Sequence, residues 1–202
     1  MPLNTPYGCW PCQREADVRL DLDRTLAGGL RLLGQRRASG GVLSMRLWVA
    51  GGSARDPEGQ RGRAQLMAGS LHRGAAGRSA DAIAELFESH GALLRSEAGE
   101  DATVVALRLA ADDAVLLGRA LADLLLRPDF PEDQVGIERE LTLRSLRRQK
   151  EDPFQTCMDQ LRLMLYGRGG YGHDPMGLEA DVAALSARNL REAHAQLGGD
   201  RA

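Results

Sequence analysis

The sequence predicts an α+β domain in which a mixed, mainly antiparallel sheet packs against helices. Two observations predict it. Short segments of strand length come first and return after one helical stretch, and a run of longer helical segments follows them. With 202 residues, 43% of them hydrophobic, the chain is long enough to bury one sizeable core. We therefore expect a flexible leader over residues 1–17 and one domain over residues 18–202.

The first strands follow the leader. Alternation over residues 18–23 resumes over residues 25–33 across Gly28 and Gly29, which predicts a hairpin. Residues 42–49 form a more apolar run, which predicts a central strand because strands buried on both faces are apolar throughout. A polar loop then leads to Gly62, and a short helix is expected from Arg63 onwards.

A helix and a second hairpin come next. Ser79 is a good N-cap for a helix that ends near His90 and Gly91. Its apolar face is predicted to consist of Ala82, Ile83, Leu86 and Phe87. Residues 93–97 and 103–109 are predicted strands, and the polar residues between them form the turn.

The remaining elements are predicted to be helical. We expect helices over residues 112–126, 132–150 and 154–166, and a last one from Leu178 or Asp181. The third carries an apolar stripe that predicts a buried face, made of Phe154, Cys157, Met158, Leu161 and Leu165. Cys157 is therefore expected in the core.

The Gly-rich segment 167–175 is expected to be a surface loop. It follows a helix, whereas a phosphate-binding loop follows a strand and carries a lysine. A charge of only −2 gives no reason to expect nucleic acid or an anionic membrane as partner. The chain has no apolar run of about 20 residues and no signal-peptide pattern, which predicts no membrane insertion and a cytoplasmic location.

Two further features of composition bear on origin and redox chemistry. Lys150 is the only lysine, and the abundance of Ala, Gly, Leu and Arg suggests a GC-rich bacterial gene. Cys9 and Cys12 have the C-x-x-C spacing of a redox or zinc half-site. They lie in a Pro- and Gly-containing leader with no strand before it, which favours a flexible tail.

Five segments, read in order, resemble the amino-terminal domain of the insulinase and mitochondrial-processing-peptidase family (M16), the inverted-zincin metallopeptidases. They are TLAGGLRLL, LRLWVAGGSARDPEGQRGRAQL, RSADAIAELFESHGALLRSEAGEDAT, LLRPDFPEDQVGIERE and YGHDPMGLEADVAALSARNL. The resemblance covers about Leu20 to Leu190 and implies an M16-like half-domain. Such domains continue into a further strand, which this sequence does not reach, so we expect an exposed sheet edge that a partner or a longer chain would cover.

Active members of this family carry His-x-x-Glu-His on the helix that follows the polar loop. Its two histidines bind zinc, its Glu activates the metal-bound water, and a later helix supplies a third ligand, a Glu. The aligned residues here are Gln65, Ala68 and Gly69, with Ser145 at the distal position. The resemblance therefore implies a helix that has lost its catalytic residues, so we expect no metal or other cofactor in this chain and zinc only in an active partner.

The four histidines and Glu138 are the other candidates for a site near the motif. None of the four histidines has metal-ligand spacing, and lone surface or cap positions are expected for His72, His90, His173 and His194. Glu138 aligns with a supporting Glu of the family and is expected to accept hydrogen bonds from a nearby arginine.

The strand that binds substrate in active relatives commonly reads G-G-x-x-N-A-x-T, where this chain reads GALLRSEA from Gly91. The candidate substrate contacts are Leu94, Arg95, Ser96 and Glu97, and a peptide would bind there by strand addition. An unoccupied edge protected by Arg95 and Glu97 is an equally open interpretation.

The resemblance implies a catalytically inactive subunit or domain that pairs with an active zinc peptidase and helps to enclose a peptide substrate, as a heterodimer. A structural assembly protein like the core proteins of the respiratory bc1 complex is the alternative. A metallopeptidase with displaced ligands is a third interpretation.

Overall fold

The computed structural model describes residues 20–37 and 40–197 and consists of two units, one ending at Gly40 and the other beginning at Gly41. The predicted leader, with its two cysteines, lies outside the described residues. In the first unit, β1 (Leu22–Thr25) pairs antiparallel with β2 (Arg31–Gly34). Gly28 and Gly29 form the turn with φ of 92° and 80°, so the predicted hairpin is confirmed with shorter strands.

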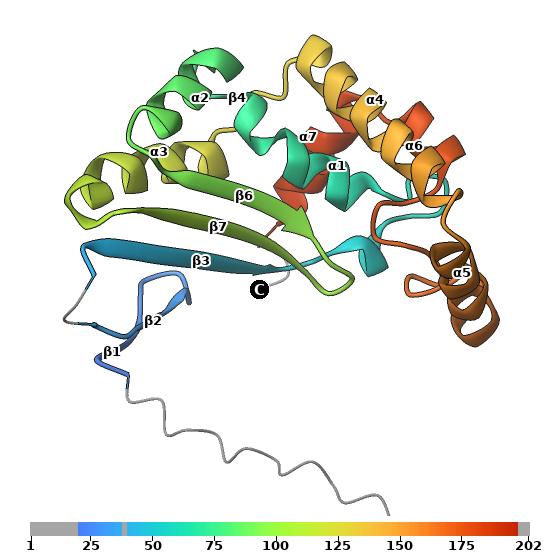
Figure 1. Cartoon of the computed structure of the whole chain (residues 1–202), viewed down its shortest axis with the longest axis horizontal. Helices are drawn as coiled ribbons and strands as arrows, with labels where there is room; N and C mark the ends of the chain where they lie inside the picture. Colours follow the sequence, from blue (N-terminus) through green and yellow to red (C-terminus); the bar gives the residue numbers. More distant parts are fainter. Residues whose placement is uncertain (1–19, 38–39, 198–202) are drawn as a thin grey trace, which may run out of the picture. The chain divides into compact units, whose positions relative to one another are not determined.

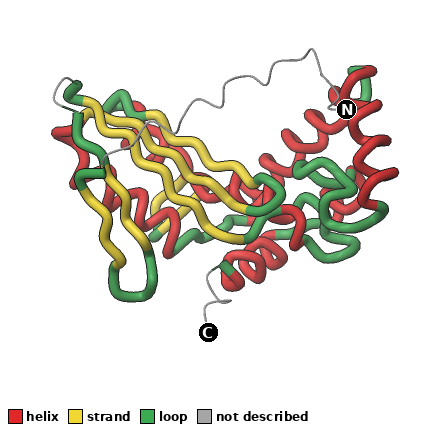
Figure 2. Tube along the Cα trace, turned by 90° about the horizontal axis from the view of Figure 1, so that it is seen from below, coloured by secondary structure: helices red, strands yellow, loops and turns green. Residues whose placement is uncertain are grey.

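The sheet of the second unit contains β3 (Val42–Ala50), β6 (Leu93–Ala98) and β7 (Ala102–Ala110) in the order β3-β7-β6, all antiparallel (Figures 1 and 2). The prediction of a central strand at residues 42–49 was wrong, because β7 is central. Leu43 and Met45 pack against the core while alternate residues of β3 are exposed, so the apolar run serves one face of the sheet.

Helices cover one face of this sheet (Figure 1). They are α1 (Arg63–Ser70), α2 (Ala80–Glu88), α3 (Ala114–Leu126) and α7 (Ala187–Gln196). A short hairpin, β4 (Gly74–Ala75) with β5 (Arg78–Ser79), connects α1 to α2. The shared core includes Leu66, Met67, Phe87, Leu107, Leu117, Phe130 and Leu190. The predicted cap is confirmed, since the Ser79 hydroxyl accepts a hydrogen bond from the Ala82 N–H at 3.3 Å.

Three further helices complete the fold: α4 (Glu132–Gln149), α5 (Pro153–Tyr166) and α6 (Glu179–Ala184). The single last helix expected from Leu178 is in fact two, because Ser186 and Asn189 form a capping box that starts α7. Among the described residues, no helix is both long and apolar enough to span a bilayer.

The expectation of a buried Cys157 was wrong. No residue of α5 is buried and Cys157 is exposed. The predicted stripe lies on α5, but its members Phe154, Leu161 and Leu165 are 71%, 44% and 65% exposed. Helical periodicity identified the apolar face, while the covering layer is missing from the described part of the chain.

Candidate functional site

Helix α1, which carries the four-residue spacing of the lost metal motif, lies between β6 and α4 (Figure 1). Seven of its eight residues are buried, and Gln65 is half-buried. The helix starts after Gly62, which adopts a φ of 100°, and the Asp56 carboxylate accepts hydrogen bonds from the N–H groups of Gly62 at 2.9 Å and Ala64 at 3.1 Å. Burial raises the pKa of Asp56 to about 6, although these two N–H groups and Arg63 oppose the shift.

Gln65, at the first metal-ligand position, ties α1 to the sheet. Its Oε1 accepts a hydrogen bond from the Ala98 N–H at 2.7 Å. One turn later, the main-chain oxygen of the fully buried Ala68 accepts one from the Ser96 hydroxyl, also at 2.7 Å. The residues at two motif positions therefore position the end of β6.

Gly69, at the second histidine position, faces Glu138 of α4. A Cβ atom at Gly69 would lie 2.7 Å from Glu138 Oε1 and 3.2 Å from its Cδ. Arg73 holds this carboxylate, because its Nε and Nη2 both donate to Glu138 Oε2, at 3.1 and 2.7 Å. The partly buried Arg73–Glu138 pair thus occupies the space beside the motif, and Arg73 is the residue of the site that the sequence alone did not identify.

The residues at the motif do not fit zinc. In place of two imidazoles, the chain has the Gln65 amide, which is bonded to Ala98, and the hydrogen of Gly69. In place of two carboxylates, it has the Ala68 methyl group and the half-buried Ser145 hydroxyl. In residues 20–37 and 40–197, no group of three or more His, Cys, Asp or Glu side chains could hold a metal ion.

The histidines do not assemble into a substitute site. The rings of His90, His173 and His194 bond to the carbonyls of Leu86, Asp174 and Leu125, at 2.9, 2.8 and 2.7 Å. A surface or cap position was expected for His173, and the surface alternative was wrong, since the residue is only 6% exposed. His72 lines the same groove as Gln65 and Gly69, and burial, followed by the charge of Arg73, lowers its pKa.

A groove of about 550 Å³ runs between the motif and β6. It is lined by Gln65, Gly69, His72 and Glu138, by residues 92–97, and by α2. The candidate substrate contacts alternate along it, with Leu94 and Ser96 half-buried and Arg95 and Glu97 exposed. An extended peptide that bound at this sheet edge would meet side chains in this alternation. The motif residues bring no nucleophile or general base to the groove.

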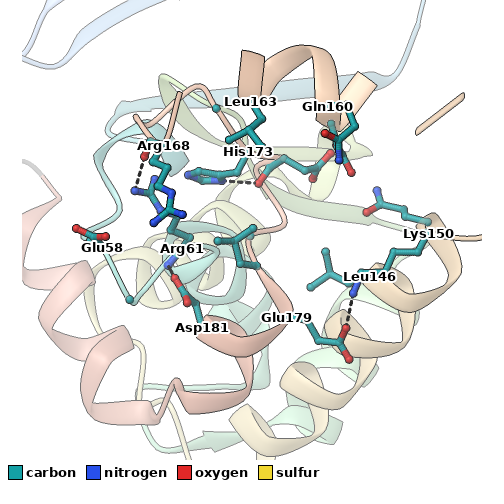
Figure 3. Close-up of a pocket in the computed structure, with 17 residues that line it drawn as sticks. Glu58, Arg61, Leu146, Lys150, Gln160, Leu163, Arg168, His173, Glu179 and Asp181 are labelled. Carbon is teal, nitrogen blue, oxygen red and sulfur yellow. Dashed lines mark hydrogen bonds and ion pairs between the residues drawn. The ribbon is translucent and has the colours of Figure 1, made fainter. Parts of the chain in front are cut away.

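A larger cavity of about 670 Å³ lies away from the motif, between the loop after α5 and helices α4 and α6 (Figure 3). Several of its polar groups are hydrogen-bonded to one another. Lys150 pairs with Glu179 at 2.6 Å, and the Arg61 N–H donates to Asp181 at 3.0 Å. Arg61 Nη2 donates to the Arg168 carbonyl at 2.5 Å. These contacts fasten the loop to the helices.

Comparisons with family models and with known proteins indicate the same family. The model of the insulinase family, peptidase family M16, matches residues 33–174. An uncharacterized zinc protease of Mycobacterium bovis is 25% identical over 170 residues, which is 84% of this chain and 39% of that protein. Subunit 1 of the mitochondrial cytochrome b-c1 complex of Caenorhabditis elegans is 23% identical over 168 residues, 83% of this chain and 36% of its own length.

Among solved structures, a peptidase M16 inactive domain from Pseudomonas fluorescens superposes with a TM-score of 0.81 and 27% identity, covering 88% of this chain and 43% of that one. The α+β half-domain architecture expected from the sequence is thereby confirmed. The chain spans less than half the length of each of these three proteins.

Proposed function

The chain belongs to the insulinase family, peptidase family M16, and from this premise we propose that it is a catalytically inactive, peptidase-like subunit or domain. In this proposal it pairs with an active zinc peptidase and supplies one wall of the space that holds a peptide. The resemblance to a solved domain described as inactive supports the first half of the proposal.

One observation carries the proposal: the motif helix is intact while its chemistry is replaced. Gln65 and Ala68 hold β6, and the Glu138 carboxylate lies against Gly69. A helix that had merely lost its ligands would leave a space of imidazole size at that position. Here the neighbouring side chains fill that space and hold the helix in place. The helix lies beside a groove that is lined by the edge strand β6.

Metal analysis of the purified chain tests the catalytic half of the proposal. We expect no zinc to survive dialysis, because no motif position offers a normal donor. His72 is the one histidine beside the motif, and His72→Ala is the informative variant. Stoichiometric zinc that is lost in this variant would overturn the proposal and favour a metallopeptidase with displaced ligands.

Reconstitution with an M16 protein that has an intact zinc motif, from the same host, tests the pairing. The two chains should co-purify, and the complex should cleave peptides that this chain alone does not. Substitutions in residues 93–97 or in the loop 167–175 should slow the partner's turnover, because a chamber wall acts by positioning the peptide. Arg188→Ala, in an exposed ion pair of α7, is the control. Equal turnover in all variants, or cleavage by this chain alone, would refute the proposal.

A second candidate is a structural role in a respiratory complex, favoured by the similarity to the cytochrome b-c1 subunit. Isolation from native membranes distinguishes the two. Respiratory subunits in the isolated complex would support the structural role, and a zinc-motif peptidase would support the inactive-subunit role.

A further inference from the structure

The free edge of β6 offers backbone groups in a fixed alternation. In the described part of the chain, β6 pairs only with β7. In an antiparallel pair, successive residues direct their N–H and C=O groups alternately towards the partner strand and away from it. The Ala98 N–H points to Gln65 and so away from β7, while the Gly99 N–H bonds to Ala102 across the turn. The same alternation directs the backbone groups of Leu94 and Ser96 to the free edge.

At one end of this edge, Gln65 accepts the hydrogen bond of the Ala98 N–H. Its Oε1 accepts from the Ala98 N–H at 2.7 Å, and Ala98 is 5% exposed, so this donor is sequestered. A histidine that binds zinc through one ring nitrogen has its other nitrogen protonated, and therefore cannot accept a hydrogen bond from an N–H. The replacement of that ligand by glutamine therefore adds a contact with the edge strand that a metal-bound imidazole cannot make.

We propose that Gln65 is a register stop for peptides that add to β6, an inference that rests on the peptide-holding function proposed above. A bound strand pairs with Leu94 and Ser96, which line the groove, and its pairing ends where Gln65 covers the Ala98 N–H. Gln65 thereby limits the length of the peptide segment that this wall can hold, and selects a peptide that ends or turns away next to Ser96.

Two variants test the proposal. Gln65→Ala removes the acceptor, while the Ser96 hydroxyl still bonds the Ala68 carbonyl and keeps β6 in place. Gln65→Glu is the matched control, because it keeps an oxygen at the same position. Hydrogen exchange of the Ala98 amide, followed by NMR in the full chain without peptide, should be slow in the wild type and in the control and fast in Gln65→Ala.

The binding probe is a series of acetylated and amidated peptides of alternating Val and Thr, with increasing length and a fluorescent label. Wild-type affinity should stop rising at a peptide length about two residues shorter than in Gln65→Ala, since each further edge-facing residue spans two positions of the added strand. The longest peptides should bind Gln65→Ala roughly 2- to 10-fold more tightly, the worth of one added backbone hydrogen bond.

The outcomes separate the two proposals. If peptides bind with the same length limit in the wild type and Gln65→Ala, or if the Ala98 amide exchanges fast in the free wild type, the register stop is wrong and the peptide-holding function stands. If no peptide binds either folded variant, the peptide-holding function fails and the register stop fails with it.

Discussion

A substitution at Gly69 measures how tightly the Glu138 side chain packs against α1. Gly69→Ala places a Cβ 2.7 Å from Glu138 Oε1, closer than carbon and oxygen normally approach, so the carboxylate must move. Moving it breaks the two hydrogen bonds from Arg73 to Glu138, a pair whose side chains are 23% and 19% exposed. Loss of a partly buried charged pair costs about 2–3 kcal/mol. Alanine in a helix recovers about 1 kcal/mol relative to glycine. The expected net loss is about 1–2 kcal/mol.

Chemical denaturation of four proteins checks this value: the wild type, Gly69→Ala, Glu138→Ala and the double variant. In the Glu138→Ala background the obstruction is gone, so Gly69→Ala should stabilise by about 1 kcal/mol, the helix propensity alone. The sign of the Gly69→Ala effect should therefore reverse between the two backgrounds, with a coupling energy of about 2–3 kcal/mol. Stabilisation by Gly69→Ala in the wild type, equal to that in Glu138→Ala, would refute the packing argument.

Three further predictions concern the frame around the site. Burial raises the pKa of Asp56 from its ordinary value of 3.8 to about 6, so the native state holds this proton to a higher pH than the unfolded state does. The free energy of unfolding should therefore fall by about 3 kcal/mol as pH rises from about 4 to 7. Urea titrations at each pH measure this fall, and this part of it should vanish in Asp56→Asn. Gly172→Ala should destabilise the chain by about 2–4 kcal/mol, because its Cβ would lie 1.8 Å from the Gly167 oxygen. Gly118→Ala, with no atom within 4 Å of its Cβ, should stabilise the chain slightly, and a similar midpoint shift in both variants would contradict this packing of the loop. Ser79→Ala should cost about 1 kcal/mol through the lost cap of α2, and an unchanged thermal midpoint would show that the cap contributes nothing.

Local signals in the sequence predicted most elements because their causes are local. The Ser79 cap, the Gly28-Gly29 turn and the stop at Gly91 each depend on residues within one turn of the chain. Strand order was mispredicted, since an apolar run such as residues 42–49 has the same hydropathy whether it lies at the centre of a sheet or at its edge. The exposure of Cys157 likewise depends on whether another segment packs on α5, and helical periodicity does not specify that.

The candidate site shows the same division between local and distant causes. The resemblance to the peptidase family identified Gln65, Ala68 and Gly69 as the positions aligned with the motif, because the flanking segments match in order and spacing. The Arg73–Glu138 pair joins residues 65 positions apart, and the hydrogen bond from Ala98 to Gln65 joins residues 33 apart. Neither contact has a signature in local sequence, so the resemblance gave the residues at the motif positions and could not give the contacts that they make.

The residues now at the motif positions oppose the creation of a zinc site by substituting ligands alone. A zinc-bound histidine at position 65 would have no acceptor for the Ala98 N–H and would leave that buried donor unpaired, which costs about 1–3 kcal/mol. One at position 69 would collide with Glu138 and release Arg73. Zinc binding would have to offset both costs before any metal was held in place. The contacts that hold β6 and α4 against α1 therefore stabilise the present packing, and a metal site here would require several coordinated substitutions. We expect this protein to act through the surfaces that α1 positions, above all the edge of β6, and not through chemistry on α1 itself.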